Sequence, residues 1–242
     1  MKSQCYHFLG TPSTAQAFVS GISNLRKNHS VTQKPIFVWE PEPRECNPEN
    51  VHLITETAKM VDVFSPNHLE LLRMFDMSPA SGAEDLKRLI EQAAQKLQAA
   101  GSGRQGRYIV IIRAADLGCM VQLTGQDSKW FPPYYEPTVS PGSTARVSHG
   151  AVLDPTGAGN AFLGAFGAEM ARSGDQFLVV THAIIAASFV VEQTGLPKID
   201  GKDQAEHERW SGVGPRQRLG SYMSRLERFG INFDLMRNRE SK

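Results

Sequence analysis

The sequence predicts an α/β fold of three layers, in which a mostly parallel sheet carries helices on both faces. Segments typical of strands alternate with segments typical of helices from the first residues onward, and this alternation is the pattern of a parallel sheet with crossover helices. Residues 36–39 form a continuous apolar run, as expected for a strand buried on both faces. The chain of 242 residues is long enough for one large α/β domain with a full core.

Short apolar runs mark the strands and N-cap signals mark the helices. The expected strands are residues 6–9, 36–39, 61–64, 108–112, 119–123, 129–131 and 151–153, of which 119–123 and 129–131 form a hairpin. The expected helix starts are Ser13 with Gln16, Asn47 with Pro48, Asn67 with Glu70, and Ser81 with Glu84. Residues 132–149 are expected to form a loop, because they are rich in Pro, Ser and Gly.

Two late segments predict helices of different kinds. Residues 177–191 are almost entirely apolar but contain Thr181, His182 and Ser188 and are too short to span a bilayer, so they predict a buried helix. His182 is then a core histidine that satisfies its own hydrogen bonds. Residues 209–242 are rich in Lys and Arg, and we expect a solvated helix packed on the domain edge in preference to a nucleic-acid surface.

Charge and cysteine content exclude several classes of protein. The formal net charge of +1 gives no overall field that would attract nucleic acid or a membrane surface. The three cysteines are far apart, odd in number and without metal-binding spacing, which predicts free thiols and a cytoplasmic, reducing location. No signal peptide is recognisable, because the apolar run after Lys2 is too short.

The run Gly157-Ala158-Gly159 is the most informative stretch of the chain. It lies between the apolar residues 151–153 and a helical pattern in which Phe162, Phe166 and Met170 recur every four residues. A turn from a strand into a helix N-terminus presents free backbone N–H groups and the positive end of the helix dipole, which together bind anions. The alternative is a tight turn in which the glycines serve the backbone geometry alone.

The residues from Asp154 to Phe162 resemble the signature of the ribokinase-like (pfkB) carbohydrate kinases, whose pattern is Asp-Thr-x-Gly-Ala-Gly-Asp-x-Phe. The resemblance implies that Gly157, Ala158 and Gly159 form an anion hole for the transferred phosphate. It also implies that Asp154 and Thr156 lie on the nucleotide side. Asn160 stands where the family has its catalytic Asp, and an amide cannot act as a general base near neutral pH.

Asn67 and Glu70 carry two alternative interpretations. They lie three residues apart at the start of a helix, so they share one face of its first turn. In the first interpretation, Asn67 caps the helix and Glu70 completes the cap near the positive end of the helix dipole. They also resemble the family motif Asn-x-x-Glu, which implies that both side chains order a Mg²⁺ ion through its waters near the phosphates of ATP.

Two further strand ends match the family more weakly. The segment from Arg113 to Gly118 follows a strand where the family shows Thr-x-Gly-x-x-Gly near the nucleotide, and of these residues Gly118 matches. Arg113 could contact phosphate bidentately or pair with Asp116. Residues 40–44 lie where the family has Asp-x-Asn-x-Arg, but a solvated charged loop is an equal alternative. These strand ends are expected to meet in one crevice at the carboxyl edge of the sheet.

The resemblance covers residues 36–195. It implies that residues 1–215 are the C-terminal, nucleotide-side part of the kinase domain, followed by a helix and basic tail at 216–242. The N-terminal part and the β lid of the family are missing before Tyr6. The implied function is an ATP- and Mg²⁺-dependent kinase that acts on a small sugar or related alcohol. A non-catalytic nucleotide-binding or partner-binding relative is the alternative, and a binding module with a purely structural glycine turn is a third.

Overall fold

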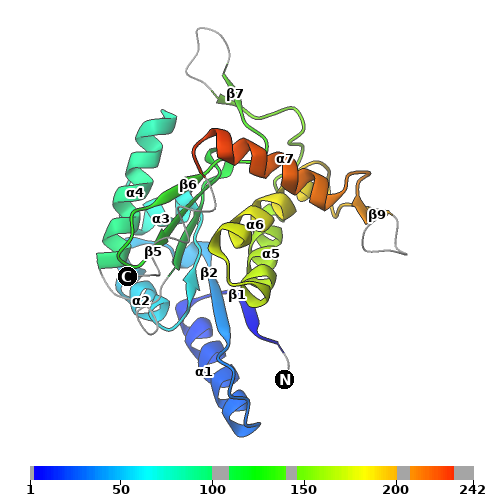
Figure 1. The fold of residues 1–242 in the computed structure, drawn as a ribbon. Helices are drawn as coiled ribbons and strands as arrows, with labels where there is room; N and C mark the ends of the chain where they lie inside the picture. The colour runs from blue at the N-terminus through cyan, green and yellow to red at the C-terminus, as the bar shows by residue number, and fades with distance from the viewer. Residues whose placement is uncertain (1–2, 100–108, 140–145, 201–207, 232–242) are drawn as a thin grey trace. The chain divides into compact units, whose positions relative to one another are not determined.

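A computed structural model describes residues 3–99, 109–139, 146–200 and 208–231. The chain divides into two compact units, Met1–Trp130 and Phe131–Lys242. The first unit contains the main sheet and the second is mostly helical (Figure 1).

The main sheet has six strands in the order β1-β2-β3-β4-β5-β6. Its strands are β1 (Cys5–Gly10), β2 (Ile36–Pro41), β3 (Val63–Phe64), β4 (Ile109–Arg113), β5 (Cys119–Leu123) and β6 (Lys129–Phe131). The pairs from β1 to β4 are parallel, and β5 runs antiparallel to β4. The predicted mostly parallel sheet is therefore confirmed, although β3 is only two residues long and Tyr108 lies outside the described residues.

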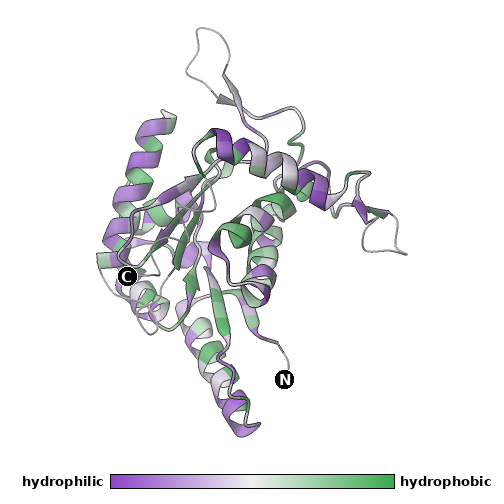
Figure 2. Ribbon diagram, in the orientation of Figure 1, coloured by the Kyte–Doolittle hydropathy of each residue, from purple (hydrophilic) through white to green (hydrophobic). Residues whose placement is uncertain are grey.

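The helices of the first unit connect consecutive parallel strands and cover one face of the sheet. They are α1 (Pro12–Asn28), α2 (Val51–Ala58), α3 (His68–Met74) and α4 (Ala83–Ala99), with short 3₁₀ turns at η1 (Pro43–Glu45), η2 (Pro48–Asn50) and η4 (Ala115–Leu117). The parallel strands β1 to β4 follow one another in the sheet in the same order as in the chain. Right-handed crossovers between such strands place their helices on the same side, so all four helices share one face. Figure 2 shows α4 as a mostly hydrophilic helix beside several strands that are largely hydrophobic.

The core of the first unit follows from this arrangement. Alternate strand residues join the helices in one buried cluster, and on the strands these residues are Phe37, Trp39, Phe64, Val110, Ile112 and Met120. The residues between them, Val38, Val63 and Ile111, point to the opposite face and are also fully buried. Both faces of the central strands are thus apolar, which explains the continuous apolar run at residues 36–39.

Three local predictions were wrong. Helix α1 is capped by Thr11 and not by Ser13, because Pro12 takes the first helical position with its fixed φ. The loop at 132–149 contains a two-stranded antiparallel sheet of β7 (Thr138–Val139) and β8 (Arg146–Val147). Residues 151–153 form no strand, and Leu153 is 70% exposed.

The second unit is built on α5 (Ala158–Arg172) and α6 (Gln176–Val190), which lie side by side (Figure 1). Helix α6 is the predicted buried helix, and the half-buried His182 ring lies 2.8 Å from the Leu178 carbonyl oxygen, so it finds a hydrogen-bond partner within the helix. The unit also contains a short antiparallel pair, β9 (Ile199–Asp200) with β10 (Arg209–Trp210), and α7 (Pro215–Arg228).

The sequence predicts that helix α7 is solvated, but its buried and half-buried side chains also hold other segments of its unit. Its buried Tyr222 donates a hydrogen bond to the Pro132 carbonyl (2.7 Å), and Arg225 donates one to the Tyr134 carbonyl (2.7 Å). Its buried Arg218 pairs with Glu192 at 2.8 Å. The helix therefore anchors the chain at 132–134 and the end of α6 within its unit.

The three cysteines are free thiols, as predicted. Among the described residues, no helix has both the length and the apolar composition needed to cross a bilayer.

Candidate functional site

The glycine turn starts helix α5, as the sequence predicts. Gly157 is the N-cap residue and adopts a left-handed backbone with φ of 84°. A side chain there would be strained by that φ, and a Cβ would lie 3.6 Å from a methyl group of Val190. Glycine at 157 is therefore required by the backbone, and the turn lies against the C-terminal end of α6.

The amide hydrogens of the turn differ in their availability. The Ala158 N–H donates to the Pro155 carbonyl (3.1 Å), and the Ala161 N–H donates to the Gly157 carbonyl (3.0 Å). The N–H groups of Gly157, Gly159 and Asn160 have no acceptor among the described residues. Gly159 and Asn160 are consecutive donors within the first turn of a 15-residue helix, at its positive end, and can hold an anion there.

Asp154 and Thr156 lie in the segment that leads into the glycine turn, and hydrogen bonds fix its backbone. The Thr156 N–H donates to Asp154 Oδ1 (2.9 Å), and hydrogen bonding from Thr156, by its side chain and its backbone, lowers the pKa of Asp154. The Leu153 and Asp154 N–H groups both donate to the Val191 carbonyl, at 2.7 and 3.2 Å. The segment is thus attached to the end of α6 in place of the predicted strand.

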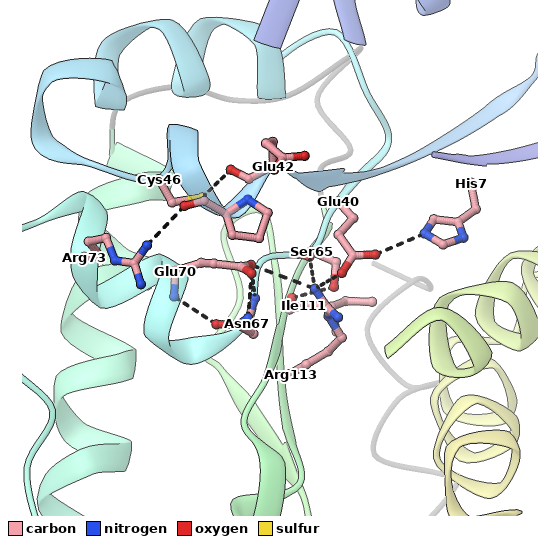
Figure 3. A network of polar contacts seen from close by, with 11 residues as sticks. His7, Glu40, Glu42, Cys46, Ser65, Asn67, Glu70, Arg73, Ile111 and Arg113 are labelled. Atoms are coloured by element: carbon pink, nitrogen blue, oxygen red, sulfur yellow. Dashed lines mark hydrogen bonds and ion pairs between the residues drawn. The ribbon is translucent and has the colours of Figure 1, made fainter. Parts of the chain in front are cut away.

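Asn67 and Glu70 form a complete capping box at the start of α3 (Figure 3). The Glu70 N–H donates to Asn67 Oδ1 (2.9 Å), and the Asn67 N–H donates to Glu70 Oε2 (2.8 Å). The Asn67 side-chain amide donates to Glu70 Oε1 (2.6 Å). The capping interpretation is therefore confirmed, and both carboxylate oxygens of Glu70 already accept hydrogen bonds.

Arg113, at the end of β4, points between two buried carboxylates (Figure 3). Its Nη2 atom lies 2.6 Å from Glu40 Oε1 and 4.0 Å from Glu70 Oε2, and it donates to the Ser65 carbonyl at 3.0 Å. Glu40 is the penultimate residue of β2, and Ser65 directly follows β3, so three neighbouring strand ends meet here. The predicted solvated loop is wrong for Glu40, which is only 7% exposed.

The two carboxylates differ in acidity. Burial by itself would raise the pKa of Glu40, but a hydrogen bond from His7 and the Arg113 charge outweigh burial and hold the pKa below its ordinary value. Burial raises the pKa of Glu70, and the Asn67 N–H and Arg113 offset that effect only in part. Glu40 is therefore the ionised partner of the guanidinium, and Glu70 is the weaker acid.

The network has further members that the sequence pattern did not reveal. His7 Nε2, on β1, lies 3.5 Å from Glu40 Oε2, and both atoms are buried without another partner. Arg113 Nε is also buried without a partner, while the Ser65 hydroxyl donates to the Ile111 carbonyl (3.0 Å). A signal existed for Glu40, because a charged residue directly follows the apolar run 36–39.

The remaining candidate, Gly118, has a backbone role. It ends the η4 turn with φ of 87° and ψ of −127°, and its carbonyl accepts the Ala114 N–H (2.8 Å), which returns the chain from β4 into β5. The sequence-predicted residues thus form two groups. Asn67, Glu70 and Arg113 meet in the first unit, and the residues from Asp154 to Asn160 meet in the second; their common crevice stays a prediction.

The oxygens of Glu70 are poorly placed to ligate directly the Mg²⁺ ion that the resemblance implies. A guanidinium already lies among the oxygens of Glu40, Ser65 and Glu70, and Glu70 is engaged by Asn67. In the described part of the chain, no group of three His, Cys, Asp or Glu side chains could hold a metal ion.

Comparison with solved structures defines the class of fold. The aminoimidazole riboside kinase of Salmonella enterica, solved with aminoimidazole riboside and an ATP analogue, superposes with a TM-score of 0.55 at 18% sequence identity. The match covers 92% of this chain and 63% of the kinase. The chain therefore has the ribokinase-like α/β fold.

Two curated yeast proteins are similar in sequence. Protein C16C9.01c of Schizosaccharomyces pombe is 33% identical over 220 residues, which are 89% of this chain and 58% of that protein. Protein MAK32 of Saccharomyces cerevisiae is 27% identical over 226 residues, or 90% of this chain and 56% of that protein. The chain thus spans about half the length of the curated relatives it matches. No protein-family model matches the chain.

Proposed function

We propose that this chain binds the phosphates of a nucleotide such as ATP at the glycine turn and transfers phosphate weakly or not at all. The observation that carries the proposal is the pair of N–H groups at Gly159 and Asn160, at the start of α5, which have no acceptor in the described part of the chain. A helix N-terminus with free donors favours anions through both hydrogen bonds and the helix dipole. A kinase of the same fold was solved with an ATP analogue, which supports a nucleotide as the anion.

The chemistry of Asn160 argues against fast phosphoryl transfer. Its side chain is exposed at the first turn of α5, where it can donate or accept a hydrogen bond and so orient a hydroxyl. It cannot take the proton of that hydroxyl, and loss of a general base typically slows a reaction by about 10²–10⁴-fold.

Sugar phosphorylation is the second candidate function. It is supported by the match to a kinase that was solved with both a riboside and an ATP analogue. In that case the free N–H groups of Gly159 and Asn160 would stabilise charge on the transferred phosphoryl group. A small sugar or a related alcohol would be the acceptor.

The test is calorimetric titration of ATP, ADP, AMP and inorganic triphosphate, with and without Mg²⁺, into the wild type and into Gly159→Pro. Proline lacks an N–H but is tolerated in the first turn of a helix, so this variant deletes one free donor and keeps α5. Because a hydrogen bond to a charged group contributes about 1.5 kcal/mol or more, we expect ATP affinity to fall about tenfold.

Gly159→Ala is the matched control, because it keeps the N–H and should bind ATP like the wild type. Circular dichroism and the melting temperature of all three proteins show whether α5 is intact. Equal ATP affinity in Gly159→Pro and Gly159→Ala would remove the glycine turn from the binding site.

A further inference from the structure

The oxygens around Arg113 come from different parts of the first unit. They are Glu40 Oε1 at 2.6 Å, the Ser65 carbonyl at 3.0 Å and Glu70 Oε2 at 4.0 Å, all measured to the single atom Nη2. Two carboxylates and a carbonyl are the kind of ligand that hard divalent cations take. A guanidinium nitrogen lies at their centre instead (Figure 3).

We propose that Arg113 is the resident cation of this oxygen cluster and that the chain consequently does not recruit a divalent metal ion at Glu70. The inference is independent of nucleotide binding at the glycine turn. It also departs from what the Asn-x-x-Glu resemblance implies, because the metal's place is taken by a side chain of the chain itself.

The Arg113 guanidinium excludes a divalent metal ion both by its size and by its charge. Nη2 is already in hydrogen-bonding contact with Glu40 and Ser65, so a metal ion within bonding distance of these oxygens would collide with the guanidinium. The positive charge also repels a second cation at short range. The Glu70 side chain is only 5% exposed, and each of its oxygens already accepts a hydrogen bond from Asn67, which leaves Glu70 less able to ligate a metal ion while the guanidinium is present.

Removal of the guanidinium should expose a latent metal site. In Arg113→Ala, the carboxylates of Glu40 and Glu70 remain with the Ser65 carbonyl but have no cation between them. Like charges that are buried together favour either protonation or the binding of a cation. We therefore expect a divalent ion to bind there and to restore part of the stability that the substitution removes.

The experiment measures Mn²⁺ binding by electron paramagnetic resonance, and the shift in melting temperature with Mg²⁺ or Mn²⁺ at constant ionic strength, all without nucleotide. We expect Arg113→Ala to bind Mn²⁺ at least about tenfold more tightly than the wild type, since both carboxylates lose the positive charge of the guanidinium. Arg113→Ala/Glu70→Gln should lose that gain. Arg113→Lys, which keeps a positive charge, should behave like the wild type.

Arg218→Ala is the matched control from the second unit. Arg218 is another buried arginine, with Glu192 at 2.8 Å and the Ser188 hydroxyl at 3.1 Å, but it pairs with only one carboxylate. Its removal should destabilise the protein without creating Mn²⁺ affinity.

Two results would overturn the proposal. The first is saturable Mn²⁺ binding by the wild type that Glu70→Gln abolishes, which can be measured even if Arg113→Ala fails to fold. The second is a folded Arg113→Ala whose Mn²⁺ affinity and melting temperature do not respond to divalent ions.

Discussion

At the scale of single residues, Glu40 and Glu70 have pKa values displaced in opposite directions, although both carboxylates face the same guanidinium. Burial raises the pKa of both carboxylates, but at Glu40 a hydrogen bond from His7 and the close Arg113 charge outweigh burial. Arg113 Nη2 is 2.6 Å from Glu40 but 4.0 Å from Glu70, and Glu40 adds a like charge that further raises the pKa of Glu70. A single guanidinium thus neutralises one carboxylate, and the second retains the cost of burial.

This difference predicts the pH dependence of stability. The pKa of Glu70 is raised above its ordinary value of 4.5, so between these two values the folded state binds more protons than the unfolded state. The free energy of unfolding therefore falls as the pH rises through that window. We expect Glu70→Gln to remove this fall, because glutamine does not titrate but can still complete a capping box.

The measurement is urea unfolding of both proteins from about pH 4 to about pH 8. Glu40 provides the contrasting case. Its pKa is lowered, so its contribution to stability is present above the unfolded pKa and is lost as the pH falls through the folded pKa. Parallel pH profiles for wild type and Glu70→Gln would show that Glu70 has an ordinary acidity.

At the scale of elements, the way a helix starts determines whether its polar groups are free to bind a ligand. The two helix starts to compare are those of α3 and α5. Asn67 and Glu70 use their polar atoms to cap α3, whereas α5 begins with a glycine that has no side chain to cap it. The N–H groups that a capping side chain would satisfy are therefore left open at Gly159 and Asn160.

The left-handed N-cap of α5 gives a prediction for stability. Gly157→Ala should lower the free energy of unfolding by about 1 kcal/mol, because φ of 84° disfavours a Cβ. Gly164→Ala is the control, since this glycine lies in the middle of α5 with no atom near its missing Cβ. That change should stabilise the protein by about 0.5–1 kcal/mol. Chemical unfolding with effects of the same sign would contradict the assigned backbone at 157.

At the scale of the whole molecule, the chain has the ribokinase-like fold and spans about half the length of the curated relatives it matches. Phosphoryl transfer requires the acceptor hydroxyl to be held in line as well as a group that takes its proton. The resemblance to the kinase signature implies that residues 154–162 bind phosphate and that Asn160 stands at the position of the base.

We accordingly predict little or no sugar-dependent ADP release by the 242-residue chain, measured with a panel of sugars. Asn160→Asp should not restore turnover by itself, because a new base needs an acceptor that is held in place. It should weaken ATP binding slightly by adding negative charge beside the Gly159 N–H. Robust turnover by the wild type would refute this prediction and favour the kinase function.

Much of the fold could be predicted because it is encoded locally. The apolar run at 36–39, the Asn67 capping box and the glycine turn at 157–159 each depend on residues that are close in sequence. Their backbone preferences and side-chain periodicity act over one or two turns of chain, so a sequence displays them directly. Where a local signal misled, as at Ser13, a stronger neighbouring signal at Thr11 and Pro12 prevailed.

Only the tertiary structure decided which polar atoms meet around Arg113 and which N–H groups of the glycine turn find an acceptor. His7, Glu40, Ser65 and Arg113 are far apart in sequence and meet only because β1, β2, β3 and β4 are neighbours in the sheet. Of the three residues expected to form the anion hole, Ala158 uses its N–H to bond the Pro155 carbonyl, whereas the next two N–H groups, of Gly159 and Asn160, have no acceptor among the described residues. Pairing of polar groups depends on distances set by packing, and no local pattern contains those distances.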